Sequence, residues 1–269
     1  MNDLLHLDRF PLFVIAGPCV IESAELCLTV GARVKQICEK LGLAYIFKAS
    51  FDKANRSSNS SFRGPGLHEG VAVLDRVKRE LGAPVLTDIH EPDQAATAAK
   101  VVDVLQVPAF LARQTDLLIA CGKTGKAVNI KKGQFMSPQE MGTAVEKVKS
   151  TGNSRIMLTE RGTFFGYNRL VNDFTALAVM KSFDVPVVFD MTHSTQQPAG
   201  MGNQSGGSPQ YSPLLARAAV AAGVDGLFLE CHPDPKSAKS DAATMMNLND
   251  VEPLLAQCKQ IAECVARNR

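Results

Sequence analysis

Five cationic side chains stand at or just after short apolar segments of this chain. They are Lys48, Lys53, Arg56, Lys131 and Arg161. Surface lysines usually lie on exposed helix faces, but a cation directly after a buried strand lies at the edge of a sheet. Several cations that converge there repel one another unless an anion relieves the repulsion. The set therefore favours binding of a phosphate or a carboxylate, and of two anionic groups more than one.

Neutral hydrogen-bond donors accompany these cations. Asn55, Ser57 and Ser58 follow Lys53 in a polar loop. The alternative to anion binding is that each cation pairs with a nearby carboxylate, such as Asp52 or Glu160. For any single cation the two interpretations are equally good, but the convergence of all five favours a binding site.

A second group of residues has the chemistry of metal ligands. It consists of Cys19, His193, Glu230 and Asp241, which follow the first and the last two apolar segments. A thiolate, an imidazole and two carboxylates suit Zn²⁺ or Fe²⁺ better than Mg²⁺, because sulfur is a soft ligand. If the first and last segments are neighbours in a closed sheet, these distant positions converge.

Ligand types alone leave several alternatives open. Cys19 beside Pro18 is more typical of a small core residue. His193 could bond a backbone group, and Asp241 could cap a helix. The competing ligands are His90, His232 and Cys231. Since Cys231 directly follows Glu230, strand alternation directs it to the opposite side if the strand extends that far.

Eight short segments rich in Val, Ile, Leu and Phe must position these residues. They span residues 12–16, 45–47, 85–87, 104–107, 127–130, 156–158, 187–189 and 226–229. Continuous apolar runs are typical of parallel strands buried on both faces, and helical patterns lie between them. The order predicts an α/β protein with a (β/α)8 TIM barrel, whose chemistry lies at the carboxyl ends of its strands.

Helix signals separate the predicted strands. Ser23 starts and Gly42 ends an apolar stripe of helical spacing, and residues 137–140 form a capping box for a helix that runs toward Gly152. Residues 213–223 and 251–266 are also predicted helices. Three polar connections, 52–69, 194–212 and 231–247, are too long for turns. The second contains Gly200, Gly202, Gly206 and Gly207, which is the composition of a mobile lid.

Composition limits the class of protein. The 269 residues fit a single barrel domain over 1–269, for which about 250 residues are typical. A net charge of +2 gives no reason to expect nucleic acid, and we find neither a membrane-spanning stretch nor a signal-peptide pattern. Seven cysteines with no C-x-x-C pair do not suggest a disulfide framework, so we expect a cytoplasmic protein.

Several longer strings resemble one enzyme family. Residues 15–19 (Ile-Ala-Gly-Pro-Cys) look like the opening of the synthases that condense phosphoenolpyruvate to 3-deoxy-aldulosonates. Residues 47–58 are similar to the hallmark of the 3-deoxy-D-manno-octulosonate 8-phosphate synthases, with Lys-Ala-Asn-Arg-Ser at 53–57. Further similar strings lie at 61–66, 87–91, 108–116, 129–132, 160–162, 165–168, 190–193 and 232–235. The resemblance covers nearly the whole chain.

The resemblance implies a reaction and a set of roles. In it, phosphoenolpyruvate, D-arabinose 5-phosphate and water give the octulosonate phosphate and inorganic phosphate, a step toward lipopolysaccharide. Phosphoenolpyruvate is expected on Lys48, Lys53, Gln106, Ala109, Lys131 and Arg161. The expected contacts of the sugar phosphate are Ser50, Asn55, Arg56, Ser57 and Asp88, with Arg113 reaching in from a neighbouring subunit of a homotetramer.

The resemblance also bears on the metal. The family has a metal-dependent class with cysteine at the position of Cys19 and a metal-independent class with asparagine there. It therefore implies Zn²⁺, Fe²⁺ or Mn²⁺ on Cys19, His193, Glu230 and Asp241. Of these ligands, His193 and Asp241 are also expected to take part in catalysis, together with Lys48, Lys53, Lys131 and Arg161. The alternatives are a heptulosonate 7-phosphate synthase that uses erythrose 4-phosphate, and a sugar-phosphate-binding barrel without catalysis.

Overall fold

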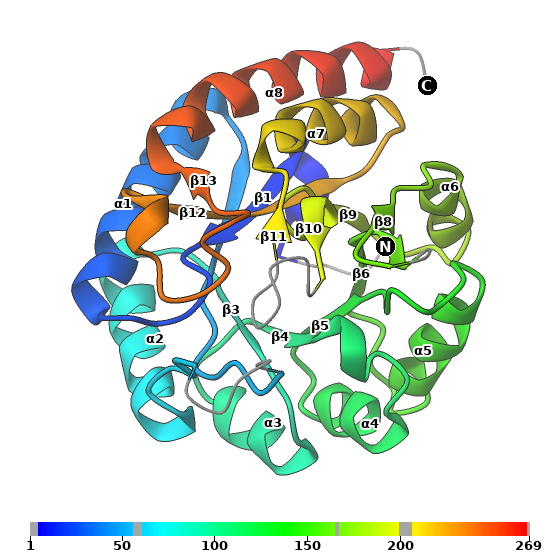
Figure 1. Cartoon of the computed structure of the whole chain (residues 1–269). Helices are drawn as coiled ribbons and strands as arrows, with labels where there is room; N and C mark the ends of the chain where they lie inside the picture. The colour runs from blue at the N-terminus through cyan, green and yellow to red at the C-terminus, as the bar shows by residue number, and fades with distance from the viewer. Residues whose placement is uncertain (1–4, 56–60, 165–166, 199–205, 268–269) are drawn as a thin grey trace.

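The computed structural model describes residues 5–55, 61–164, 167–198 and 206–267 (Figure 1). Arg56 and Ser57, which the sequence predicts to bind the sugar phosphate, lie outside these ranges, as do Ser58, Gly200 and Gly202. No described helix is both long and apolar enough to cross a lipid bilayer.

Eight parallel strands form a closed barrel, as the sequence predicts. They are β1 (Phe13–Gly17), β2 (Ala44–Lys48), β3 (Val85–Asp88), β4 (Val104–Val107), β5 (Ala127–Lys131), β6 (Ile156–Glu160), β9 (Val187–Asp190) and β12 (Gly226–His232). Each strand pairs with the next in this order, and β12 pairs with β1, so that Gly17 lies beside Glu230. The fold is a (β/α)8 TIM barrel, and its closure brings the first and last strand ends together.

In the part of the chain that the structure describes, eight α-helices surround the barrel, and Figure 1 shows them as a ring around the central strands. They are α1 (Ala24–Leu41), α2 (Leu67–Leu81), α3 (Pro92–Ala98), α4 (Thr115–Lys123), α5 (Glu140–Lys149), α6 (Thr175–Lys181), α7 (Ser212–Ala221) and α8 (Val251–Arg267). Short strands occur in the loops after the barrel strands: β7 (Thr163–Phe164) with β8 (Leu170–Val171), β10 (Gln196–Gln197) with β11 (Gly206–Gly207), and β13 (Met246–Asn247) beside β12.

The helix ends follow local sequence signals in one case and depart from them in another. At the start of α1 the Ser23 side chain accepts from the Leu26 N–H, and Gly42 ends the helix in the left-handed conformation, as predicted. The capping box at 137–140 is only half formed. Glu140 accepts the Ser137 N–H, but residues 138 and 139 form a turn and α5 begins at Glu140.

Alternation along the strands divides the apolar residues into two cores. A small cluster fills the barrel and includes Phe13, Val104 and Phe228, with Leu7 packed against it from the 3-10 helix η1 (Leu7–Arg9). A larger cluster lies between the strands and the ring of helices. The next inward-facing positions toward the carboxyl ends are polar, so the barrel interior changes from apolar to polar along its axis.

The strands are longer than predicted at their carboxyl ends. Lys48, Asp88 and Lys131 are the last residues of their strands, although the sequence places them after the strands. The strands β6, β9 and β12 extend to Glu160, Asp190 and His232 in the same way. An apolar pattern ends where the polar layer begins, but the ladder continues because these buried polar groups bond to one another.

Candidate active site

A cavity of about 630 Å³ opens at the carboxyl ends of the barrel strands. Of the residues that the sequence predicts to form the site, eleven line it: Lys48, Lys53, Asn55, Asp88, Gln106, Ala109, Lys131, Arg161, His193, Glu230 and Asp241. Cys19 and Ser50 lie directly behind this lining and bond to Asp241 and Asp88. The structure therefore brings together nearly all the predicted residues that it describes.

Three of the lysines that line the cavity, Lys48, Lys53 and Lys131, face carboxylates. Lys48 pairs with Glu230 and also donates to the Cys19 carbonyl oxygen at 2.9 Å. The Nζ of Lys131 lies 2.6 Å from Asp190. These contacts agree with the alternative of carboxylate pairing, but the partners differ from those expected, because Asp52 pairs with Arg63 and Glu160 with Lys132.

Lys53 also lines the cavity, but its carboxylate partner is farther away. Lys53 Nζ is 3.7 Å from Asp88 Oδ2, which is beyond direct hydrogen-bond distance. Burial lowers the pKa of Lys53, but the neighbouring acidic groups, first Cys19 and then Glu230 and Asp88, outweigh it and hold the pKa above its usual range. Among the described residues, Lys53 is therefore a charged donor without a tight carboxylate partner.

Arg161 is the cation that most clearly lacks a carboxylate. Its side chain is buried, and Nη2 donates to the Gln196 side chain. Among the described residues, Nη1 has no hydrogen-bond partner. The neighbouring Glu160 points away from the cavity and instead accepts the backbone N–H groups of Arg161 and Gly162, at 2.9 and 2.7 Å. A buried guanidinium with an unused N–H is a donor for an anion that enters the cavity.

The cations keep the carboxylates of the site ionised. Burial raises the pKa of Asp88, but Lys48 and Lys53 outweigh it and hold that pKa well below its usual range. Asp190 has a lowered pKa because His193 and Lys131 outweigh the effect of burial. The pKa of Glu230 is lowered in the same way, mainly by Lys48. The site thus alternates positive and negative charges rather than presenting cations alone.

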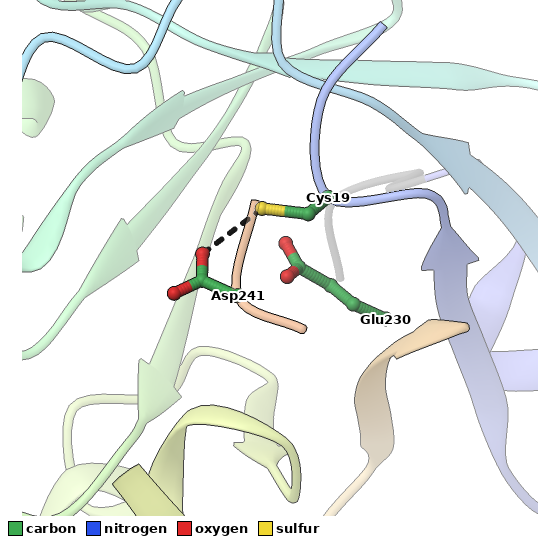
Figure 2. A group of neighbouring side chains, drawn as sticks. All are labelled: Cys19, Glu230 and Asp241. Atoms are coloured by element: carbon green, nitrogen blue, oxygen red, sulfur yellow. Dashed lines mark hydrogen bonds between the residues drawn. The ribbon is translucent and has the colours of Figure 1, made fainter. Parts of the chain in front are cut away.

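Cys19, Glu230 and Asp241 form a cluster in which one potential ligand atom of each lies within 4.8 Å of the others. Figure 2 shows the three side chains pointing toward one common space from three separate segments. The Cys19 thiol donates to Asp241 Oδ2 at 3.0 Å and to the Ser240 hydroxyl at 3.1 Å. Glu230 Oε2 is buried and has no hydrogen-bond partner among the described residues.

This donor set fits a divalent metal. Burial, Glu230 and Asp241 raise the pKa of the Cys19 thiol, although Lys53 and Lys48 lower it. A metal ion would favour the thiolate, would relieve the repulsion among three acidic groups and would occupy the unused lone pairs of Glu230. The sulfur favours Zn²⁺ or Fe²⁺ over a hard cation.

His193, the fourth predicted ligand, lies beside this cluster without belonging to it. Its Nε2 is 3.6 Å from Glu230 Oε2, and its Nδ1 is 2.7 Å from Asp190 Oδ2. A carboxylate on the far ring nitrogen is the usual way in which a protein orients a metal-binding imidazole. His193 as a ligand stays a prediction.

The competing ligands have other surroundings. Cys231 lies on the outer side of the barrel wall, in the core beneath the helices, as strand alternation predicts because β12 extends to His232. The Nδ1 of His232 accepts the Asp234 N–H at 3.0 Å. His90 lies edge-on to Phe51, with 5.8 Å between ring centroids. Among the described residues, none of the three joins the metal cluster.

Gln196 is a site residue that the sequence indicates only as part of a long loop. Its side-chain oxygen accepts from Arg161, and its nitrogen donates to Asp241 Oδ1 at 3.0 Å. Gln196 therefore links Arg161 to the cluster of Cys19, Glu230 and Asp241. Asp241, at the other end of this bridge, has a left-handed backbone with φ of 51°, which is unfavourable for most residues other than glycine, asparagine and aspartate. No motif in the sequence signals either feature.

Arg113 does not reach the cavity within its own chain. Its side chain is exposed and lies 3.9 Å from Glu140. Exposed aromatic residues are found in the same loops after β4, β5 and β6, namely Phe110, Phe135 and Phe164. An exposed arginine among exposed aromatic side chains is typical of a protein interface.

Comparisons with known proteins give a consistent result. The DAHP synthetase I family matches residues 8–267. A protein from Cyanothece sp. that is named 2-dehydro-3-deoxyphosphooctonate aldolase is 53% identical over 264 residues, 98% of this chain and 97% of the relative. Proteins of the same name from Desulfatibacillum aliphaticivorans and Xanthomonas oryzae pv. oryzae are 54% and 58% identical, and cover 95% and 93% of this chain and 94% and 90% of their own lengths.

Proposed function

The chain belongs to the DAHP synthetase I family, and we propose that it condenses phosphoenolpyruvate with D-arabinose 5-phosphate. Water is consumed, and the products are 3-deoxy-D-manno-octulosonate 8-phosphate and inorganic phosphate. The observation that carries this proposal is the cavity in which Arg161 and the lysines of the lining lie beside the cluster of Cys19, Glu230 and Asp241. The relatives named 2-dehydro-3-deoxyphosphooctonate aldolase support this function rather than heptulosonate synthesis.

The chemistry of that name fits the cavity. An aldol disconnection of a phosphooctonate separates a pyruvate unit from a pentose phosphate. In the synthetic direction, phosphoenolpyruvate supplies the pyruvate unit as an enol with a phosphate and a carboxylate. Two substrates that each carry phosphate explain why so many cations converge on one cavity.

Phosphoenolpyruvate takes the deeper position. Lys131 and Arg161 neutralise its anionic groups, with Lys48, Lys53 and Gln106 beside them. The Nζ of Lys131 also lies 3.9 Å from the centre of the Phe228 ring, which fixes this cation above the apolar part of the barrel. The backbone at Ala109 borders the same position.

Arabinose 5-phosphate lies nearer the opening. Asp88 and Asn55 line that part of the cavity, and Ser50 donates to the Asp88 carboxylate from behind. Arg56 and Ser57 belong to the same loop, so we assign the sugar phosphate to it as well. Held in this order, the enol carbon faces the aldehyde carbon, and the barrel supplies the proximity that the reaction needs.

The reaction forms a carbon–carbon bond and a carbon–oxygen bond to water, and it breaks the carbon–oxygen bond to phosphate. The enol carbon attacks the aldehyde, water adds to the carbon that carries the phosphate ester, and phosphate leaves from that carbon. His193, held by Asp190, and Asp241, held by Gln196, lie close enough to the cavity to hold or move protons of water or the aldehyde oxygen. A divalent metal (Zn²⁺, Fe²⁺ or Mn²⁺) on Cys19, His193, Glu230 and Asp241 would supply Lewis acidity at this point.

Three further features belong to the same proposal. The predicted lid over 194–212 belongs to the proposal, although its residues 199–205 lie outside the described ranges; the described strands β10 (Gln196–Gln197) and β11 (Gly206–Gly207) pair with each other and lie over the barrel in the view of Figure 1. The enzyme is a homotetramer in which Arg113 reaches a neighbouring cavity. It works as one catalytic domain in the cytoplasm, a compartment that agrees with seven cysteines of which none forms a disulfide bond among the described residues.

The test is release of phosphate from phosphoenolpyruvate with each of two sugars. We expect turnover with arabinose 5-phosphate, loss of turnover after chelation, and recovery with Zn²⁺, Fe²⁺ or Mn²⁺. Preference for erythrose 4-phosphate would establish heptulosonate synthesis instead. Tight binding of both substrates without phosphate release would identify a binding protein.

A further inference from the structure

A row of four polar side chains runs across consecutive barrel strands from β6 to β3. The Thr159 hydroxyl donates to Asn129 Oδ1 at 2.7 Å, and Asn129 Nδ2 donates to Gln106 Oε1 at 2.9 Å. Gln106 Nε2 in turn donates to Asp88 Oδ1. These residues come from four consecutive strands and are all buried. We call them the amide chain.

The chemistry at its two ends gives the amide chain one direction. Asp88 is held ionised by the lysines around it, so its carboxylate can only accept. Gln106 must therefore turn its nitrogen toward Asp88 and its oxygen toward Asn129. Asn129 must then turn its own nitrogen toward Gln106, which leaves its oxygen for the Thr159 hydroxyl. Each amide is thus fixed against a flip by the neighbour on either side.

Only half of the amide chain can touch a ligand. Asp88 and Gln106 line the cavity, whereas Asn129 and Thr159, both with no exposed surface, do not. The Nε2 of Gln106 carries two hydrogens, and Asp88 is its one acceptor among the described residues. The second hydrogen is therefore available to a bound anion. A flipped amide would present an oxygen, which an anion would be repelled by.

We propose that Thr159 and Asn129 are positioning residues, which keep Gln106 turned as a donor toward phosphoenolpyruvate. This inference rests on the proposed function. The role of the two residues is to select an anionic group over a neutral or donating one at this point, although neither touches the substrate. Burial without contact to the ligand distinguishes them from the residues of the lining.

Two substitutions of Thr159 test the proposal. Thr159→Val keeps the volume of the side chain and removes the donor, so that Asn129 Oδ1 loses its partner. Thr159→Ser keeps the donor and removes a methyl group. We expect Thr159→Val to raise the Kd and the KM of phosphoenolpyruvate about tenfold, with kcat less affected, because a buried acceptor is left unsatisfied. Thr159→Ser is expected to recover most of this loss.

Calorimetric titration with phosphoenolpyruvate, initial rates and urea unfolding midpoints are the measurements. A Thr159→Val protein that binds phosphoenolpyruvate as the wild type does would overturn the inference. So would a Thr159→Ser protein that is impaired as much as Thr159→Val, since that result indicates packing alone.

A third variant makes the test independent of packing at Thr159. Asn129→Asp replaces the donor that faces Gln106 by an oxygen, so the Gln106 amide has to turn or lose its partner. We expect weaker phosphoenolpyruvate binding than in Thr159→Val, and unchanged binding would contradict the amide chain. If the wild type binds phosphoenolpyruvate but does not turn over arabinose 5-phosphate, the proposed function fails. The binding comparison between Thr159→Val and Thr159→Ser still decides the inference.

Discussion

The two sides of the cavity satisfy their polar groups in different ways. Within the strands β3 to β5, Asp88, Gln106 and Asn129 bond to one another, although His90 Nδ1 and Gln134 Oε1, in the loops after β3 and β5, are buried without a hydrogen-bond partner among the described residues. On the β6–β12 side, Arg161 Nη1 and Glu230 Oε2 are buried without a hydrogen-bond partner among the described residues. We call these the closed side and the open side. A closed network holds a shape before any ligand arrives, whereas unused donors and lone pairs indicate where ligands bind.

The largest expected effect is that of removing the metal from the open side. Chelation should lower the rate by about a thousandfold, because charge stabilisation by a bound metal is worth several kcal/mol. Cys19→Asn should show reduced metal content and a similar loss of activity. Cys231→Ala is the control, since Cys231 lies on the outer side of the same wall. Elemental analysis measures the metal content, and phosphate release measures the activity. Full activity after thorough chelation would show that the reaction does not need a metal on the open side.

A smaller effect is expected from replacing Arg161, whose Nη1 has no hydrogen-bond partner among the described residues. Arg161→Met should lower kcat/KM for phosphoenolpyruvate by about a hundredfold, because a charge-assisted hydrogen bond to a buried anion is worth up to about 3 kcal/mol. Arg161→Lys keeps the charge and should lie between this variant and the wild type. Initial-rate kinetics decide the point. A loss from Arg161→Met no greater than that from Thr159→Val would mean that the open side is not the stronger anion site.

The closed side should be visible in the acid stability of the protein. The pKa of Asp88 is lower in the folded chain than its ordinary value of 3.8. The unfolded chain therefore binds more protons below about pH 4, so this contribution to stability is present above that pH and is lost as the pH falls toward the lowered pKa. Urea unfolding of metal-free protein between about pH 5 and pH 3 measures it. Asp88→Asn should have a shallower pH dependence, and an identical slope would contradict the ionised anchor of the amide chain.

The smallest effect concerns the exposed Arg113. Arg113→Ala should raise the KM of arabinose 5-phosphate by less than about tenfold, because the contact is near the opening. Mixed oligomers of Arg113→Ala and Arg161→Met test whether it acts across subunits. A cavity with Arg161 from one chain and Arg113 from its neighbour is intact, so the active cavities of the mixed oligomers should recover the wild-type KM of arabinose 5-phosphate. Mixed oligomers that keep the raised KM of Arg113→Ala would place Arg113 outside the neighbouring site.

The sequence predicts the barrel well because each strand signal is local. The apolar runs identify all eight barrel strands, and alternation correctly places Cys231 outside the wall. The pairing of Lys48 with Glu230 was not predictable, since it depends on the register across β1 and on rotamers. Gln196 was missed for a related reason, because a loop glutamine acquires its role only from the two partners that the fold brings to it. The predicted start of α5 was wrong because residues 138 and 139, which were expected to be helical, form a turn.

The apolar cluster inside the barrel has a consequence for the order in which the substrates bind. Leu7 and Phe13 belong to the cluster that fills the interior below the polar layer, so the cavity has its floor there and is entered from the strand ends. In such a blind channel the molecule that binds deeper has to enter before the one that binds nearer the opening. Arabinose 5-phosphate that binds first would then block the entry of phosphoenolpyruvate. We expect excess arabinose 5-phosphate to slow the enzyme, and added phosphoenolpyruvate to relieve this inhibition.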